Sequence, residues 1–232
     1  MVKRMKRKRF VLVIGFLCTV IISSICFSRI ISINADRDIR MLDGVTVVID
    51  SGHGGNDGGT KSMDVKEKDI NLKIAIKLKE LLEKNGTNVV MTRDGDYDLA
   101  EDGIGSRKKA DMKKRVEIIN DAKTDLFLSI HLNAYPNPSV KGAQAFYASD
   151  NEVSKVFANI VQNHLKILTN TKMTSKPGNY YILNNTEKIG VLVECGFLSN
   201  AEDKAKLIED NYQQKLAQTL YDSIVEYFQF LS

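Results

Sequence analysis

Short apolar runs rich in β-branched residues alternate along this chain with longer segments whose apolar residues recur at helical spacing. The first such helical stripe consists of Ile70, Ile74, Leu78, Leu81 and Leu82, with Lys and Glu on the opposite face. Residues 93–109 are polar and contain glycine, which predicts a surface loop with some local structure at most. The pattern predicts strands at 45–50, 88–92, 126–131, 142–148 and 189–195, and helices at 69–85, 110–122, 152–168, 201–208 and 212–230.

Strands that alternate with helices predict the α/β class. We expect a single-domain three-layer sandwich, in which a mostly parallel twisted sheet carries helices on both faces. In such sheets the functional loops gather at the carboxyl ends of the strands. We therefore look for functional side chains at the carboxyl ends of the predicted strands.

The first 33 residues differ from the rest of the chain. Six of residues 1–9 are Lys or Arg, and residues 10–27 form an apolar run without a charge. A basic start followed by such a run indicates a signal peptide or an N-terminal membrane anchor. Because no clear cleavage site follows, we favour an uncleaved anchor, with a linker at 34–44 and an exported catalytic domain at 45–232.

Charge is distributed unevenly between these parts. Residues 1–40 contain nine Lys or Arg and two Asp, so the net charge of +4 describes the N-terminal segment and not the domain. Because the domain itself is slightly acidic, nothing indicates a nucleic-acid surface. Of three cysteines, only Cys195 lies outside the apolar segment, so we expect no disulfide within the domain.

Four residues with metal or acid–base chemistry lie at or near predicted strand ends. His53 follows the first strand, and His131 ends the third. Glu194 ends a late strand, and Glu67 comes just before the first helix, where its side chain would point back toward the strand ends. Two imidazoles and a carboxylate suit Zn²⁺, with a fourth position left for water as in catalytic zinc sites.

Each of these residues also has an interpretation without function. His53 fits a solvated turn, His131 fits the core, and Glu67 between two lysines fits a surface charge. Glu194 is harder to explain in this way, because burying an unpaired carboxylate in an apolar strand is costly. Their shared placement at strand ends favours function, although spacing alone leaves both interpretations open.

Several competing motifs are excluded. The loop at 52–59 lacks the Gly-Lys-Ser/Thr of a phosphate-binding loop, and the chain contains no His-Glu-x-x-His motif. Asp94, Asp96 and Asp98 imitate the start of an EF-hand loop, but Leu99 and Gly105 occupy the positions that require Gly and Glu.

The motifs around these residues closely resemble those of the zinc-dependent N-acetylmuramoyl-L-alanine amidases. The resemblance runs from about Val45 to the C-terminus, in the right order. It is carried by Asp-Ser-Gly-His-Gly-Gly at 50–55, Lys-Glu-Lys-Asp-Ile-Asn at 66–71, Met-Thr-Arg at 91–93, Ser-Ile-His-Leu-Asn at 129–133 and Val-Glu-Cys-Gly-Phe-Leu-Ser-Asn at 193–200. The short single-domain layout looks like the germination-specific, CwlD-type members from spore-forming bacteria.

This resemblance implies a set of roles. His53, Glu67 and His131 would hold Zn²⁺, and Glu194 would be the catalytic residue. Asn133 is a candidate for orienting a ligand or the substrate. The implied reaction hydrolyses the amide between N-acetylmuramic acid and L-alanine in peptidoglycan, and the resemblance implies the spore cortex as its place and a step toward muramic-δ-lactam as its role. Glu194 would accept a proton from water and pass it to the departing nitrogen.

The implied partners are peptidoglycan outside the cytoplasm, the membrane through an uncleaved N-terminal segment, an accessory protein and a downstream deacetylase. Two other functions are compatible with the same fold. One is a non-catalytic peptidoglycan-binding module, and the other is a zinc peptidase or carboxypeptidase acting on another wall bond. The presence of all four site residues argues against the first of these.

Overall fold

The computed structural model describes residues 23–24, 41–62, 64–101, 105–121 and 123–232. The chain divides into two compact units, Met1–Met41 and Leu42–Ser232, and the second contains the sheets and the helices α2–α7. Apart from Ser23 and Ser24, the expected N-terminal segment at 1–33 lies outside the described residues, as does most of the linker. Across the described residues, no helix combines the length and the apolar character needed to span a bilayer.

A six-stranded sheet forms the middle of the domain. Its order is β4-β1-β5-β8-β6-β7, and the neighbours β4, β1, β5 and β8 are all parallel. Only β6 runs antiparallel to its neighbour β8, while β6 and β7 are parallel to each other. The strands are β1 (Thr46–Ser51), β4 (Asn88–Met91), β5 (Leu126–Asn133), β6 (Gln144–Tyr147), β7 (Lys176–Pro177) and β8 (Gly190–Phe197).

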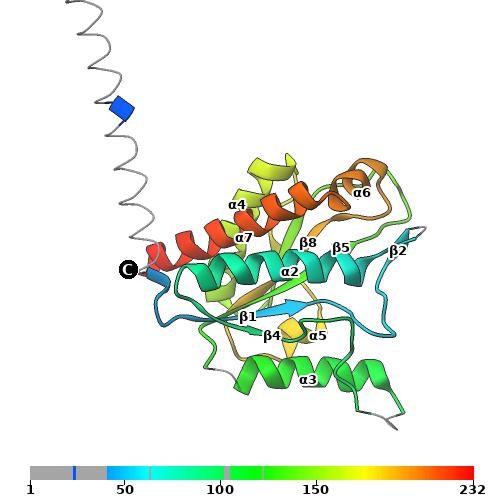
Figure 1. Ribbon diagram of the computed structural model, residues 1–232, viewed down its shortest axis with the longest axis horizontal. Coiled ribbons are helices and arrows are strands. Elements are labelled where there is room, and N and C mark those ends of the chain that lie inside the picture. The colour runs from blue at the N-terminus through cyan, green and yellow to red at the C-terminus, as the bar shows by residue number, and fades with distance from the viewer. Residues whose placement is uncertain (1–22, 25–40, 63, 102–104, 122) are drawn as a thin grey trace, which may run out of the picture. The chain divides into compact units, whose positions relative to one another are not determined.

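Helices cover both faces of this sheet, which confirms the predicted three-layer α/β arrangement (Figure 1). On one face, α7 packs between α2 and α4, and on the other face α3 lies beside the short α5. A separate short hairpin pairs β2 (Lys61–Ser62) with β3 (Val65–Lys66). The helices are α2 (Glu67–Lys84), α3 (Arg107–Asp121), α4 (Glu152–Thr169), α5 (Tyr181–Asn184), α6 (Ala201–Leu207) and α7 (Asp210–Leu231).

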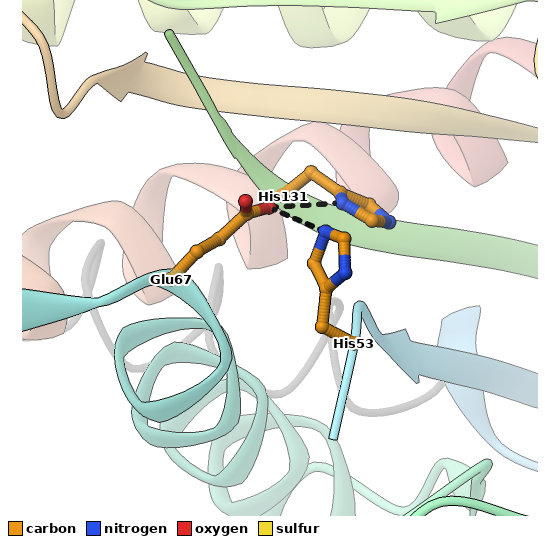
Figure 2. A group of neighbouring side chains, drawn as sticks. All are labelled: His53, Glu67 and His131. Carbon is orange, nitrogen blue, oxygen red and sulfur yellow. Dashed lines mark hydrogen bonds and ion pairs between the residues drawn. The ribbon is translucent and has the colours of Figure 1, made fainter. Parts of the chain in front are cut away.

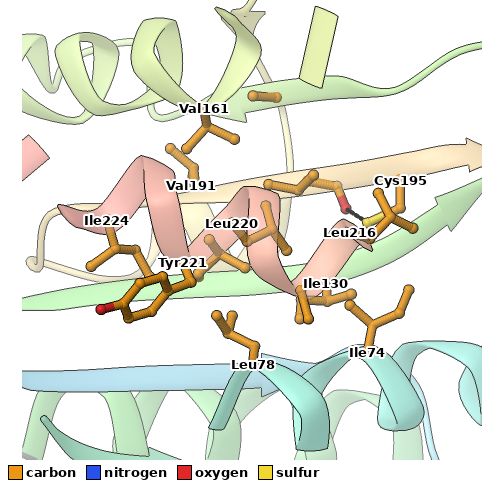
Figure 3. Packing of buried hydrophobic residues seen from close by; sticks show 14 of the residues in the cluster. Ile74, Leu78, Ile130, Val161, Val191, Cys195, Leu216, Leu220, Tyr221 and Ile224 are labelled. Atoms are coloured by element: carbon orange, nitrogen blue, oxygen red, sulfur yellow. Dashed lines mark hydrogen bonds between the residues drawn. The ribbon is translucent and has the colours of Figure 1, made fainter. Parts of the chain in front are cut away.

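The core forms two clusters because successive side chains of each strand point to opposite faces. Ile49, Ile130 and Val193 belong to the larger cluster. In Figure 3, Ile130 and Val191 of this cluster pack against side chains of α2, α4 and α7. Val48 and Phe127 belong to the smaller cluster, beneath α3 and α5. By the same alternation, Asp50, Ser129, His131 and Glu194 face the side of α3 and α5, at the carboxyl ends of their strands.

The structure corrects several element boundaries. The helix expected at 69–85 begins at Glu67, so this residue is the first of the helix instead of preceding it. The helix expected at 110–122 begins at Arg107, inside the segment 93–109 that was expected to be a loop. The hairpin β2–β3, the strand β7 and the helix α5 were not predicted, because two to four residues carry too little periodic pattern.

Candidate metal centre

His53, Glu67 and His131 come together at the carboxyl end of the sheet (Figure 2). His53 lies in the loop that follows β1, and His131 lies near the end of the neighbouring strand β5. Glu67 is the first residue of α2, whose first turn also contains Asp69. A carboxylate is favourable there because the helix N-terminus carries a partial positive charge.

One carboxylate oxygen lies between the two imidazoles. Glu67 Oε1 is 3.1 Å from His53 Nε2 and 3.0 Å from His131 Nδ1. The same oxygen accepts hydrogen bonds from the backbone N–H of Leu132 and the side-chain amide of Asn71. The other oxygen, Oε2, accepts from the backbone N–H of Thr60 at 2.8 Å. The carboxylate is therefore fixed at both oxygens, with Oε1 facing the two rings.

Two glycines make this close arrangement possible. A Cβ at Gly52 would lie 2.3 Å from the ring of His131, so no larger residue fits between β1 and that ring. A Cβ at Gly59 would lie 2.6 Å from Glu67 Oε2, and Gly59 has φ +62°, a conformation that glycine adopts without strain. The glycine-rich loop is thus shaped around the three candidate ligands.

The ionisation of these groups is coupled. Burial opposes the charged form of Glu67, yet hydrogen bonds from His131 and His53 hold the pKa of its carboxyl below the ordinary value. Burial also opposes the charged imidazole of His53, but Glu67 and then Asp57 raise its pKa overall. A cation that binds here would replace the protons shared between the carboxylate and the two imidazoles, because metal ligands bind in their deprotonated forms.

Glu194 occupies the strand beside His131. The two residues are paired in the parallel register of β5 and β8, and Glu194 is only 6 % exposed. Its Oε1 accepts a hydrogen bond from the Tyr180 hydroxyl at 3.3 Å, and its Oε2 is buried without a hydrogen-bond partner among the described residues. Burial, and then the negative charge of Glu67, raise the pKa of Glu194 to about 7 despite the opposing effect of His131.

Asn71, which the sequence analysis did not single out, contacts Glu67. The Asn133 side-chain oxygen accepts a hydrogen bond from the backbone N–H of Ala134, so a role for Asn133 in orienting a ligand or substrate stays a prediction. Asn71 instead donates to Glu67 Oε1 at 3.3 Å and to the Gly52 carbonyl at 3.2 Å. Its spacing of four residues from Glu67 on one helix was the signal that could have revealed it.

Two buried arginines hold the loop that carries His53. Arg93 donates to five backbone carbonyls, those of Ser51, Gly52, His53, Lys68 and Gly95. Arg115 donates to the carboxylates of Asp50 and Asp111 and to the carbonyls of Ser51 and His53. His53 has φ +63°, which is rare for a residue with a side chain. The arginines hold its carbonyl in place and so stabilise that conformation.

Replacing Arg115 with methionine is expected to destabilise the domain by about 3–5 kcal/mol, because it leaves a charged carboxylate buried without its partner. Arg115 and Asp50 are each 1 % exposed, and their ion pair is 2.7 Å long. Burial opposes ionisation of Asp50, but Arg115 keeps the pKa of its carboxyl below the ordinary value. Urea unfolding of the metal-free protein measures the change.

The matched control for this prediction is Lys114→Met, one residue earlier on the same helix, where the side chain is 46 % exposed and pairs with Glu117. We expect its unfolding curve to overlay that of the parent protein. A loss of less than about 1 kcal/mol for Arg115→Met would show that the buried pair does not hold the loop.

The family model described as N-acetylmuramoyl-L-alanine amidase matches residues 47–226. The germination-specific N-acetylmuramoyl-L-alanine amidase of Bacillus subtilis (strain 168) is 38 % identical over 192 residues, which cover 81 % of each chain. The N-acetylmuramoyl-L-alanine amidase LytC of the same strain is 33 % identical over 80 % of this chain and 36 % of that protein.

Two solved structures are similar in both fold and sequence. The CwlD amidase from Clostridioides difficile, in complex with the GerS lipoprotein, has a TM-score of 0.78 and 36 % identity. That match covers 81 % of this chain and 100 % of the other. The catalytic domain of CwlV from Bacillus (Paenibacillus) polymyxa var. colistinus has a TM-score of 0.71 and 32 % identity, with coverage of 80 % and 98 %.

Proposed function

The chain belongs to the N-acetylmuramoyl-L-alanine amidase family, and we propose that a zinc ion held by His53, Glu67 and His131 serves its reaction. The enzyme hydrolyses the amide bond between N-acetylmuramic acid and L-alanine in peptidoglycan. The observation that carries the zinc proposal is the convergence of one carboxylate oxygen and two ring nitrogens within 4.8 Å of one another.

This donor set fits zinc. Two imidazole nitrogens and one carboxylate oxygen are the protein ligands of many hydrolytic zinc sites, which keep a fourth position open. Glu67 Oε1 is the carboxylate oxygen that lies close to both ring nitrogens, so it is the oxygen placed to bind a cation. Cys195 does not compete as a ligand, because its thiol is fully buried and burial raises its pKa.

Glu194 is proposed as the general base and then the general acid. When bound, zinc would polarise the scissile carbonyl and lower the pKa of water. Glu194 accepts one proton from the attacking water, whose oxygen bonds to the carbonyl carbon. As the C–N bond breaks, Glu194 gives that proton to the nitrogen, because an unprotonated amine leaves poorly. The products are the lactyl carboxylate on the glycan and a free peptide amine.

Two features of the structure support this role for Glu194. Its raised pKa of about 7 suits a group that must both accept and donate a proton near neutral pH. The Tyr180 hydroxyl donates to Oε1, whereas Oε2 has no hydrogen-bond partner among the described residues and so keeps its capacity to accept a proton. Tyr180 is itself held by edge-on contact with Phe146, at 5.2 Å between ring centroids.

The biological setting is inferred from the similar proteins. Similarity to a germination-specific amidase supports spore-cortex peptidoglycan as the substrate, with a deacetylase acting on its product toward muramic-δ-lactam. Action in the wall places the domain outside the cytoplasm, tethered to the membrane if the N-terminal segment is retained. The solved complex of a CwlD amidase with a lipoprotein supports an accessory protein for this chain as well.

Digestion of purified cortex and vegetative peptidoglycan, followed by fragment masses, tests the proposal. We expect intact stem peptides with a free L-alanine amine and glycan strands that keep their lactyl groups, and we expect zinc removal to abolish their release. Released terminal amino acids would indicate a carboxypeptidase, and binding without any cleavage would indicate a wall-binding module. The digestion is run with and without a GerS-like lipoprotein, so that a missing accessory protein is not mistaken for inactivity.

A further inference from the structure

The ring of His53 has a second carboxylate partner, on the side away from Glu67. Asp57 Oδ2 lies 3.0 Å from His53 Nδ1, while His53 Nε2 faces Glu67. We propose that Asp57 is a positioning residue that fixes the tautomer and orientation of His53 for metal binding through Nε2. This inference rests on the proposed zinc site and adds a residue that the sequence analysis missed.

The loop holds Asp57 in place through several contacts. Its backbone N–H and carbonyl both pair with Gly54, at 3.0 and 2.9 Å, which closes a tight turn directly after His53. Its Oδ1 accepts from the Gly59 N–H at 3.1 Å. Lys108 Nζ, from α3, lies 3.3 Å from Oδ2. The carboxylate that contacts His53 is therefore anchored independently of the imidazole.

The chemistry of imidazole makes this contact consequential. A neutral imidazole has one N–H donor and one lone pair, so a carboxylate acceptor at Nδ1 leaves the lone pair at Nε2. A carboxylate on the outer nitrogen of a metal-binding histidine also makes the inner nitrogen a better ligand. Asp57 thereby directs the lone pair of His53 toward Glu67 and the proposed ion.

The two histidines differ in this respect. His131 presents Nδ1 to Glu67, and within the described part of the chain no other carboxylate contacts its ring. The other side of the His131 ring lies close to Gly52, where a side chain would collide with it. The metal-facing atoms are therefore Nε2 of His53 and Nδ1 of His131. Among the described residues, only His53 has a second carboxylate, that of Asp57, at its other ring nitrogen.

Chelator competition on the purified full chain measures the zinc affinity of the parent, Asp57→Asn and Asp57→Ala. We expect about 10–100-fold weaker zinc binding for Asp57→Ala, the usual effect of losing such a partner. Asp57→Asn keeps an acceptor for the Nδ1–H but not the charge, so its zinc affinity is expected to lie between that of the parent and that of Asp57→Ala. Asp150→Asn, an exposed acid in the turn before α4, is the matched control and is expected to bind zinc like the parent.

A second readout separates positioning from folding. Thermal unfolding in excess chelator is expected to be nearly the same for the parent, Asp57→Asn and Asp150→Asn, because asparagine keeps the size and the acceptor oxygen of Asp57. Asp57→Ala also loses the acceptor of the Gly59 N–H and is expected to unfold at a lower temperature. Nitrogen-15 spectra of histidine-labelled, zinc-loaded protein report the tautomers directly, and the chain has only three histidines to assign. We expect His53 protonated at Nδ1 and His131 protonated at Nε2.

Three outcomes are distinguishable. Weaker zinc binding with the expected tautomers supports the proposal. Zinc affinity of Asp57→Ala within about twofold of the parent, or His53 protonated at Nε2, overturns the role of Asp57 and leaves the zinc site intact. A parent protein that binds no zinc overturns the proposed function itself.

Discussion

Replacing Glu194 with glutamine is expected to lower kcat on peptidoglycan by about 10²–10⁴-fold, the usual contribution of a general acid–base group. Glutamine keeps the size of the side chain and can still accept from Tyr180, but its amide cannot take a proton from water. Glu194 lies outside the set of three converging ligands, so bound zinc is expected to remain near one per chain. Release of free L-alanine amines and metal analysis of the same preparations measure both effects.

The control for this variant is Glu80→Gln, at an exposed position on α2, which is expected to keep full activity. If Glu194→Gln retained activity within about tenfold of the parent, another group would have to be the base. If it lost zinc as well, Glu194 would be a ligand, and the division of roles between the two glutamates would be wrong.

Replacing His131 with alanine is expected to weaken zinc binding strongly. Losing only the outer partner of a metal-binding histidine costs about 10–100-fold in affinity, so losing the ligand itself is expected to cost more than about 100-fold. His131 lies 3.0 Å from Glu67 Oε1 and supplies one of the two imidazoles of the proposed site. Metal analysis after dialysis against a weak chelator, together with amidase activity, measures the loss.

The chain supplies a matched control in its third histidine. His164 lies on α4, where its Nε2 is 2.7 Å from Glu226, away from the three candidate ligands. His164→Ala is expected to retain zinc and activity. Equal zinc content in the His131 and His164 variants would be incompatible with a centre built on His131.

The layered fold could be predicted from the sequence because its signals are repeated. The buried strands are short apolar runs, and α4 and α7 have continuous apolar faces over about five and six turns. His131 and Glu194 stood out for the same reason, since they are polar groups at the ends of such strands, whereas Glu67 lies between two lysines and was assigned as a ligand through the motif resemblance. The structure brings His53, Glu67 and His131 together as the motif resemblance implied.

Three other features could not be predicted, because nothing in the sequence pattern indicates the partners or directions involved. Arg93 was placed in a surface loop, yet it is 1 % exposed and its hydrogen bonds all go to carbonyl groups, which leave no mark in the sequence. The antiparallel direction of β6 was equally hidden, because the alternation of side chains is the same in either direction. Asp57 sits in a glycine-rich loop without a periodic pattern to indicate where its carboxylate points.

The distribution of the ligands along the chain has a consequence for folding. His53 and Glu67 are close in sequence, but His131 belongs to β5, which lies beside them because it pairs with β1 in the middle of the sheet. The unfolded chain therefore contains at most a fragment of the ion-binding set, and the complete set exists only once the central strands have assembled. An ion that recognises the native state alone adds to its stability. We expect zinc to extend the lifetime of the folded enzyme in the wall far more than it hastens the enzyme's first folding.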